Sequence, residues 1–139
     1  MNKIDRDNNV TRKFQPMSKR FIVWDKELQK FYEDSNGIVS SVGLYGLAEF
    51  LNICGRPLEQ LEVIQSTNLF DKNGKEIFEG SIVENHFIGK NGCVYYDEDV
   101  AGWRILYKDG TWDDLYYVRS DIATVGHILS NLELLEEHK

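Results

Sequence analysis

The dipeptide Asn73-Gly74 constrains the fold of this chain more than any other short segment. Asn-Gly is strongly preferred in two-residue type I′ turns, because such a turn needs positive φ at both central residues. Apolar pairs flank the dipeptide, Leu69-Phe70 before it and Ile77-Phe78 after it. We therefore predict a β-hairpin with Asn73 and Gly74 as its central turn residues, between a strand ending near Lys72 and one beginning near Lys75.

From residue 61 onward, short apolar runs alternate with glycine-bearing turns, which is typical of all-β architectures. The pattern Gly80-Ser81-x-Val83 followed by Gly92-x-Val94 is that of SH3-like barrels, in which glycine lets the backbone bend at the corners. We predict an SH3-like small β-barrel of about five strands in the C-terminal half, with Gly80 and Gly92 as structural turn residues. The predicted strands are Leu61–Thr67, Ile77–Phe78 continuing into Ser81–Asn85, Gly92–Tyr96, Trp103–Tyr107, a weaker piece near Leu115–Val118, and Ala123–Leu129, followed by a helical turn over Asn131–Glu137.

The N-terminal half predicts a β-hairpin and one short amphipathic helix. Arg20–Trp24 and Lys30–Tyr32 have the character of two strands joined by a turn over Asp25–Gln29. Apolar residues then recur at helical spacing, with Ser40 or Ser41 as the expected cap and Gly55 as the expected stop. The predicted buried face of this helix is Leu44, Leu47, Ala48, Leu51 and Cys54, widened by Phe50.

Charge is unevenly distributed along the 139 residues. Residues 1–20 hold six basic and two acidic side chains, a charge of +4, and the remainder holds ten basic and twenty-one acidic, a charge of −11. Residues 1–18 have few apolar positions and are expected to form a polar basic arm. Residues 19–139 suit one domain with two lobes, the hairpin and helix over 19–60 and the barrel over 61–139. No apolar stretch approaches the roughly 20 residues of a membrane span, so no membrane contact is expected.

The sequence contains no recognised catalytic or metal-binding motif, such as G-x-S-x-G, a P-loop, H-E-x-x-H or G-x-G-x-x-G. Cys54 and Cys93 do not form a C-x-x-C pair, so two free buried thiols are expected, with a disulfide as the less favoured alternative. Alternation along its strand predicts that His127 faces away from the core, and His86 is expected at an exposed rim. We expect no cofactor, no metal and no enzymatic activity.

Residues 95–117 contain seven aromatic side chains, and residues 97–121 carry seven acidic against three basic ones. Strand alternation divides the aromatic residues between core and surface, so barrel packing and a binding face both remain open. Exposed Trp and Tyr beside carboxylates suit a protein interface or a basic ligand. The candidate interaction surface consists of Trp103, Tyr107, Trp112, Asp113, Asp114 and Tyr116.

The segment 69–80 also resembles the signature of the YopX family, small proteins encoded by phages and prophages. The opening 21–25 is similar to the family's aromatic start ending in Trp-Asp. The ending 125–128, followed by 131–135, is similar to its closing strand and short acidic tail rich in leucine. The resemblance runs from about Arg20 to Leu135.

Two positions depart from the family pattern. Ser81 stands where the family usually has Asp, and Leu132 where it usually has Pro. Both are turn or cap positions, so they bear on local geometry more than on the fold. The resemblance implies a phage or prophage protein in the cytoplasm of a bacterial host, and it brings no assigned activity.

The acidic body and the aromatic stretch favour a non-enzymatic accessory protein that binds another protein, of host or phage origin. The alternative is a nucleic-acid-binding small barrel in which the basic arm supplies the phosphate contacts, although a body charge of −11 disfavours it. The arm is also expected to mediate homo-oligomer formation. The candidate arm contacts are Lys13, Phe14, Met17, Lys19 and Arg20.

Overall fold

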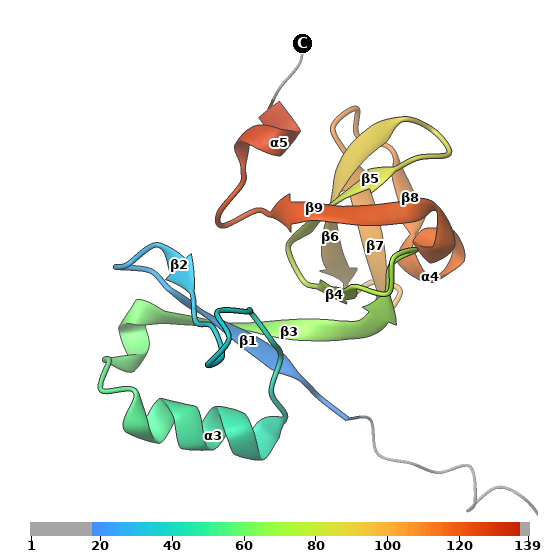
Figure 1. Cartoon of the computed structure of the whole chain (residues 1–139). Helices are drawn as coiled ribbons and strands as arrows, with labels where there is room; N and C mark the ends of the chain where they lie inside the picture. Colours follow the sequence, from blue (N-terminus) through green and yellow to red (C-terminus); the bar gives the residue numbers. More distant parts are fainter. Residues whose placement is uncertain (1–17, 137–139) are drawn as a thin grey trace, which may run out of the picture.

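Two antiparallel sheets, linked by one long strand, dominate the computed structural model, which describes residues 18–136 (Figure 1). The four-stranded sheet contains, in spatial order, β2 (Lys30–Phe31), β1 (Phe21–Asp25), β3 (Leu61–Phe70) and β4 (Glu76–Phe78). The five-stranded sheet contains β8 (Trp112–Asp114), β7 (Gly102–Tyr107), β6 (Lys90–Asp97), β5 (Ser81–Asn85) and β9 (Ile122–His127). The helices are α3 (Leu44–Ile53), α4 (Leu115–Val118) and α5 (Glu133–Glu136), with short 3-10 turns at Leu58–Gln60 and Arg119–Asp121.

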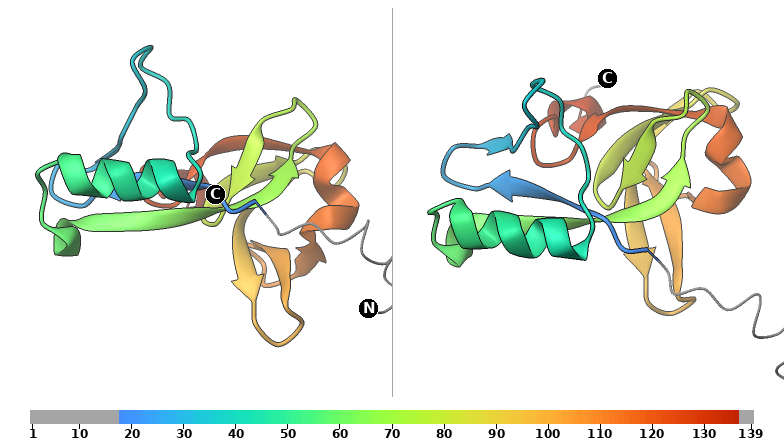
Figure 2. Two further views of the ribbon diagram at one scale, coloured as in Figure 1. Left: turned by 90° about the horizontal axis from the view of Figure 1, so that it is seen from below. Right: turned by 60° about the horizontal axis from the view of Figure 1, so that its bottom comes forward.

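The two sheets form two lobes. In Figure 2 the five-stranded sheet curls on itself on one side, and α3 lies along the strands of the other sheet. The predicted fold class, mainly β with a small barrel-like sheet in the C-terminal half and a hairpin and helix before it, is confirmed. We call the two parts the barrel lobe and the hairpin–helix lobe.

Helix α3 begins without a side-chain cap, so the predicted serine cap is wrong. Gly43 is the N-cap residue. The Ser41 hydroxyl instead accepts a hydrogen bond from Arg20 Nε (2.8 Å) and donates one to Glu76 Oε1 (2.9 Å). Gly55 follows the helix with φ of +73°, the left-handed conformation that ends helices, as predicted.

The packed face of α3 is narrower than the sequence predicted. Leu47 is buried and packs with Val23 and Leu61, whereas Leu44 and Ala48 are exposed. The helix therefore contacts the sheet along a single stripe, and a short helix leaves both flanks of that stripe to solvent. The partly buried residues around this small core are Phe21, Tyr32, Val42, Phe50, Leu51 and Cys54.

Strand β3 belongs to both lobes. Its first half pairs with β1 and its second half with β4, and the register shifts between Ser66 and Leu69. Asn68 lies at this shift with φ of 62°, so the irregularity is a β-bulge that re-aims the strand. The predicted lobes over 19–60 and 61–139 are thus joined through a shared strand.

The turn after β3 has three residues, so the type I′ prediction for Asn73 and Gly74 is wrong. Asp71 N–H donates to Lys75 O (2.8 Å), and Gly74 N–H donates to Asp71 O (3.0 Å). Lys72 and Asn73 therefore occupy the centre, and Gly74 follows them with φ of +79°, as in three-residue hairpin loops. The buried Asp71 carboxylate favours this loop, because it accepts the N–H groups of Asn73 (2.8 Å) and Lys75 (2.9 Å).

Asp71 also holds β9 against this turn. Its second carboxylate oxygen accepts the N–H of Thr124 (2.7 Å), and Lys72 N–H donates to Ile122 O (3.0 Å). Burial alone would raise the pKa of Asp71, but the three backbone N–H donors lower it below its usual value. One ionised side chain therefore links segments 53 positions apart in the sequence.

Both predicted glycines are sterically required, but only Gly80 lies in a turn; Gly92 lies within β6, paired with Val83 and Tyr107, so its prediction as a turn residue is wrong. A Cβ atom on Gly92 would lie 2.5 Å from Ile105 Cγ2 and 2.9 Å from the carbonyl oxygen of Leu106. A Cβ atom on Gly80, whose φ is +86°, would lie 2.6 Å from the His127 ring. The side chains beside Gly92, Ile105 and Tyr107, belong to the barrel core. This core consists of Ile77, Val83, Val94, Ile105, Tyr107, Leu115 and Ile122, with Leu69, Trp103 and Val118 packed against it.

The predicted weak strand near 115–118 is wrong, because these residues form α4. Strand β8 lies just before it and pairs with β7. The Asp114 carboxylate accepts the N–H of Tyr116 (3.0 Å) as the N-cap of α4, and Leu115 is fully buried in the barrel. A capped helical turn therefore satisfies the backbone where the chain leaves the sheet.

His127 is buried, contrary to the prediction from alternation. The register between β5 and β9 shifts, so that Ile82 pairs with Gly126 and Val83 with Thr124. Val125 is the extra residue of this bulge, which reverses the alternation for the positions after it. The His127 ring accordingly points inward, where it contacts Phe31 edge to face at 5.0 Å.

Candidate functional site

The outer face of β7 and β8 carries part of the predicted interaction surface. Arg104 pairs with Asp114, and Leu106 pairs with Trp112. Directly opposite residues of an antiparallel pair share one face of the sheet, so these four side chains lie together on the outside. Ile105, in the barrel core, pairs with Asp113, which therefore belongs to the inner face.

Trp103 and Tyr107 lie on the inner side of the barrel, so they are not part of an exposed surface. The Tyr107 hydroxyl donates to Asp113 Oδ2 (2.7 Å) and accepts from Asn85 Nδ2 (2.9 Å). Burial raises the pKa of Tyr107 to about 12. Trp103 packs partly against the barrel core and contacts the Tyr96 ring at 5.1 Å. Alternation on β7 accounts for both positions, because they share the parity of Ile105.

Three aromatic rings of β8 and α4 are exposed. The exposed fractions are 50% for Trp112, 53% for Tyr116 and 79% for Tyr117. Tyr117 was not among the predicted surface residues, because a strand over 115–118 would have pointed it away from Tyr116, whereas the turn of α4 leaves both rings exposed. We name the set Leu106, Trp112, Asp114, Tyr116 and Tyr117 the aromatic face.

Two arginines lie over the faces of two of these rings. The Arg104 guanidinium carbon is 3.7 Å from the centroid of Trp112, and that of Arg119 is 3.8 Å from the centroid of Tyr116. Arg104 Nη1 also donates to Asp97 Oδ2 (2.6 Å), while its buried Nε has no hydrogen-bond partner among the described residues. The arginines hold the rings in place, and nothing in the amino-acid sequence beyond their charge indicated this role.

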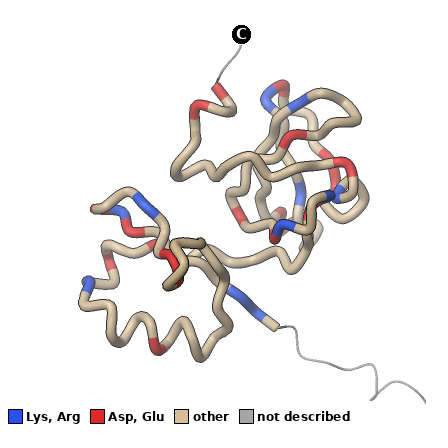
Figure 3. The backbone as a smooth tube through the Cα atoms, in the orientation of Figure 1, with Lys and Arg blue, Asp and Glu red and all other residues tan. Residues whose placement is uncertain are grey.

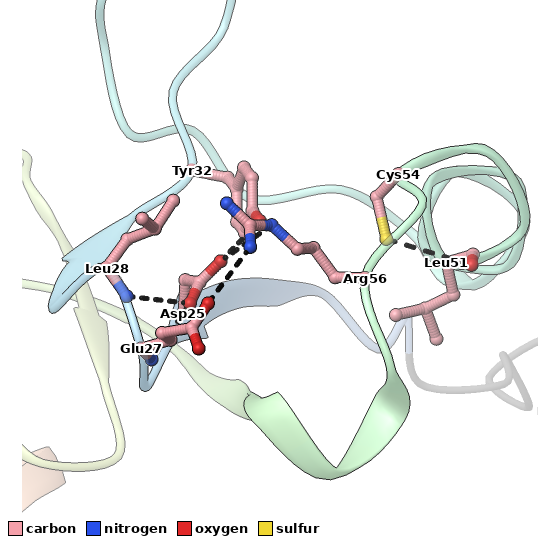
Figure 4. Close-up of polar contacts among 7 residues, drawn as sticks. All are labelled: Asp25, Glu27, Leu28, Tyr32, Leu51, Cys54 and Arg56. Carbon is pink, nitrogen blue, oxygen red and sulfur yellow. Dashed lines mark hydrogen bonds and ion pairs between the residues drawn. The ribbon is translucent and has the colours of Figure 1, made fainter.

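A second polar cluster, around Asp25, has a structural role (Figure 4). The Asp25 carboxylate is fully buried and accepts the N–H groups of Glu27 and Leu28 (2.9 Å each) and the Tyr32 hydroxyl (2.7 Å). Arg56 Nε lies 3.5 Å from it. The N–H of Leu28, followed by the Tyr32 hydroxyl, lowers the pKa of Asp25. Its lone pairs are used within the chain, so the cluster fixes the β1–β2 turn and offers no reactive group.

A cavity of about 460 Å³ lies between α5 and two turns of the barrel lobe. Its polar groups are already engaged, since Lys90 pairs with Asp109 at 2.5 Å and Asn91 Nδ2 donates to the carbonyl of Leu134 (3.2 Å). The cavity therefore shows how α5 is attached to the barrel. It does not assemble the convergent polar set of an active site.

Neither thiol forms a disulfide, so the two cysteines are free as predicted, but both are only partly buried. Burial, reinforced by the Glu79 carboxylate, raises the pKa of Cys93 to about 11, so this thiol stays protonated at neutral pH and is a poor nucleophile. Within residues 18–136, no three His, Cys, Asp or Glu side chains are grouped so that they could hold a metal ion. No helix in the same range is long and apolar enough to cross a membrane.

The predicted arm contacts fall mostly outside the described residues, which begin at residue 18. Lys13, Phe14 and Met17 precede residue 18 and therefore lie outside the described residues. Lys19 is exposed, and Arg20 is held by Ser41 through its hydroxyl and its carbonyl oxygen (2.5 Å). Along the described backbone, basic and acidic positions are interspersed over both lobes and form no basic stripe (Figure 3).

Comparison with known proteins places the chain in a family. The family described as "YopX protein" matches residues 20–136. No curated protein matches the chain. The crystal structure of protein EF1440 from Enterococcus faecalis is similar, with 22% identity, a TM-score of 0.50, and coverage of 86% of this chain and 99% of that one. The crystal structure of protein yopX from Bacillus subtilis has 17% identity, a TM-score of 0.46 and the same coverage.

The family match spans most of the chain and agrees with the resemblance that the sequence shows from about Arg20 to Leu135. The similarity to EF1440 concerns the fold alone, because the identity is low. Several residues of the resemblance now have structural explanations, among them the buried Asp25 and Asp71 and the close-packed Gly80. This chain belongs to the YopX family.

Proposed function

We propose that this protein is a phage-encoded accessory protein that works without catalysis, by binding another protein in the cytoplasm of the bacterial host. The observation that carries the proposal is the aromatic face, where Trp112, Tyr116 and Tyr117 are at least half exposed and Trp112 lies opposite the exposed Leu106. Trp, Tyr and Arg are enriched at protein interfaces, and they contribute most of the binding energy there.

The proposed partner surface is basic or hydrogen-bonding rather than acidic. Asp114 shares the outer face with Trp112, and Arg104 and Arg119 show that the rings of Trp112 and Tyr116 already accept guanidinium groups. A partner arginine or lysine would meet both the ring faces and the carboxylate. A rigid anchor also loses little conformational entropy on binding, and the stacked arginines supply this rigidity.

The test is affinity capture from host lysate, with and without phage infection, using the whole chain and two variants. Trp112→Ala with Tyr116→Ala should remove the captured partner. Phe87→Ala is the matched control, because Phe87 is an exposed aromatic residue elsewhere on the barrel lobe, and it should capture the partner fully. Equal capture by all three proteins, or turnover of a host metabolite by the unmodified chain, would contradict the proposal.

Nucleic-acid binding through the basic arm is the competing function. It requires the +4 charge of residues 1–20 to overcome the −11 of the remainder. Filter binding at low salt discriminates the two. Micromolar binding that disappears when Lys13, Lys19 and Arg12 are changed to Glu would favour this alternative over the protein-binding proposal.

A further inference from the structure

A small apolar groove lies in the hairpin–helix lobe, between β1, α3 and the segment that joins β2 to α3. Figure 2 shows this segment projecting from the sheet as a loop. Both ends of the loop line the groove, Tyr32 at one end and Val42 at the other. The volume is about 150 Å³, and the apolar lining consists of Phe21, Val23, Tyr32, Val42 and Phe50.

The groove has room for one aromatic ring. An apolar cavity of about 150 Å³ is large enough for a benzene molecule. Tyr32 and Phe50 form a firm wall, because their rings contact each other edge to face at 4.7 Å. Phe21, Tyr32, Val42 and Phe50 are only partly buried although they pack against a hydrophobic core, which leaves apolar surface that a further side chain would cover.

The rim of the groove is held in shape by Asp34. The Asp34 carboxylate accepts the N–H groups of Asn36 (2.8 Å) and Ile38 (3.0 Å) and the Ser40 hydroxyl (3.1 Å). Asp34 N–H donates in turn to Ile38 O (2.7 Å). The two sides of the loop are thus tied together, so a side chain that enters the groove meets a site that is already formed.

Exposed apolar side chains are concentrated in the same part of the chain. Ile38 and Val39 lie in the loop, Leu44 and Tyr45 begin α3, and all four are exposed, Tyr45 by 93%. Grouped exposed apolar residues mark sites of interaction with other molecules. This group belongs to the hairpin–helix lobe and is separate from the aromatic face, which lies on the barrel lobe.

Charge around the groove selects a basic partner. Glu33 and Asp34 line it and are exposed, and the described residues that line it include no basic side chain. The N–H groups of Ile38 and Asn36 lower the pKa of Asp34, so its carboxylate is ionised at neutral pH. Arg20 is close in sequence to the lining residues, but its guanidinium is already held by Ser41. A cation beside the groove would therefore meet two carboxylates.

We propose that this groove is a second docking site, for a protein segment that presents a phenylalanine side chain next to a lysine or arginine. The ring enters the groove and covers the partly buried apolar lining, as an anchor residue does in an interface pocket. The neighbouring cation lies against Glu33 and Asp34 at the rim. This site is independent of the proposed function, which rests on the other lobe.

A peptide titration of the full-length chain tests the site by two-dimensional NMR. The probe is the acetylated and amidated peptide Gly-Phe-Lys-Gly, and the backbone amides of Val23, Val42 and Phe50 should shift with a Kd of about 1 mM. The peptide with serine in place of phenylalanine should bind at least about tenfold more weakly, because the buried ring is lost. Glutamate in place of lysine should weaken binding about fivefold at low salt.

Charge variants of the chain locate the peptide. Glu33→Lys should weaken binding of the lysine peptide about fivefold at low salt, and it should favour the peptide that carries glutamate there. Glu62→Lys is the matched control. Glu62 is also exposed, but it pairs with Trp24, on the opposite face of the sheet from Val23. It should change neither affinity by more than about 1.5-fold.

Two further variants complete the test. Val42→Phe should fill the groove and abolish the shifts, and its own spectrum shows whether it is folded. Trp112→Ala with Tyr116→Ala should bind the peptide like the unmodified chain, so this site and the aromatic face can fail separately. Absence of shifts at the groove, equal binding of the serine peptide, or loss of binding in that double variant would overturn the proposal. Shifts of the same amides on dilution of the peptide-free protein would assign the groove to a second copy, and they would overturn it as well.

Discussion

The two lobes differ in how completely their cores are closed. In the barrel lobe Ile77, Val83, Ile105, Leu115 and Ile122 have no exposed surface, whereas the core of the hairpin–helix lobe rests on three residues that are 5–8% exposed. Strands and α4 surround the first core, while one ten-residue helix covers the second. The difference indicates that the barrel lobe supplies most of the stability and that the hairpin–helix lobe keeps apolar surface for other contacts.

The sharpest test of this comparison is a matched pair of large-to-small substitutions. Ile105→Ala should reduce the free energy of unfolding by about 4 kcal/mol, because the surrounding side chains cannot collapse into the cavity. Leu47→Ala should cost about 2 kcal/mol, since one side of its site is open. Urea unfolding of both variants measures the difference, and equal losses would show that the two cores are equally closed.

The hydrogen bonds of Asp71, which hold β9 against the turn after β3, should contribute nearly as much to the free energy of unfolding as the side chain of Ile105. Asp71→Ala removes the acceptor of three backbone N–H groups and should destabilise the fold by about 3 kcal/mol. Asp71→Asn keeps the shape and one oxygen, so about half of that loss is expected. Thermal melts provide the measurement, and an unchanged melting temperature in Asp71→Ala would mean that β9 is held without this carboxylate.

A comparison of two glycines with positive φ distinguishes the energetic cost of backbone strain from that of a steric contact. Gly80→Ala should cost about 2 kcal/mol, because its Cβ meets the His127 ring as well as an unfavourable φ. Gly74→Ala should cost only about 1 kcal/mol, because nothing lies within 4 Å of its Cβ position. Chemical denaturation compares them, and a larger effect at Gly74 would contradict the tight contact between Gly80 and His127.

The smallest expected effect is a pH dependence from His127, which lies where the lobes meet. Its Nε2–H donates to Glu79 O (2.8 Å) and its Nδ1 accepts from Leu129 N–H (3.1 Å), so the neutral ring is fully bonded. Burial lowers the pKa of His127. Its contribution is therefore fully present above about pH 6.5, the value of an unfolded histidine, and is lost as the pH falls below it.

Unfolding measured between pH 7 and pH 5 reports this loss before the carboxylates titrate. The variant His127→Gln should unfold with less dependence on pH in that window. If the variant and the unmodified protein lose stability in parallel, another group is responsible for the pH dependence.

Local patterns predicted the fold class and most strands, because alternation and glycine-bearing turns report directly on sheets. They failed where one side chain or one extra residue changes the geometry. The Asp71 carboxylate favours a three-residue loop over the type I′ turn, and the bulge at Val125 moves His127 inward. The loop depends on two local hydrogen bonds to one carboxylate, from Asn73 and Lys75, and the position of His127 depends on the register with β5, about 40 positions earlier in the sequence.

The candidate surface was predictable only in part. Trp112 and Tyr116 are exposed, and Asp114 caps α4. The other three predicted surface residues lie on the inner side of the barrel: Trp103, Tyr107 and Asp113. The register of a strand pair decides which alternate residues of each strand face the core. A stretch rich in aromatic residues does not by itself determine that register. The role of Arg104 depends on the register between β7 and β8, which places it diagonally opposite Trp112. The role of Arg119 depends on the helical turn of α4, which brings it over Tyr116 three positions earlier.

The pairing of β5 with β9 has a consequence for how the chain folds as it is synthesised. Strand β5 is complete at residue 85, but its second neighbour ends at residue 127. Until that last strand leaves the ribosome, one edge of β5 and the apolar Ile82 and Val83 stay uncovered, and they can pair with other nascent chains. The protein is therefore most prone to aggregation in the final moments of translation, and a chain truncated before β9 would retain that vulnerability permanently.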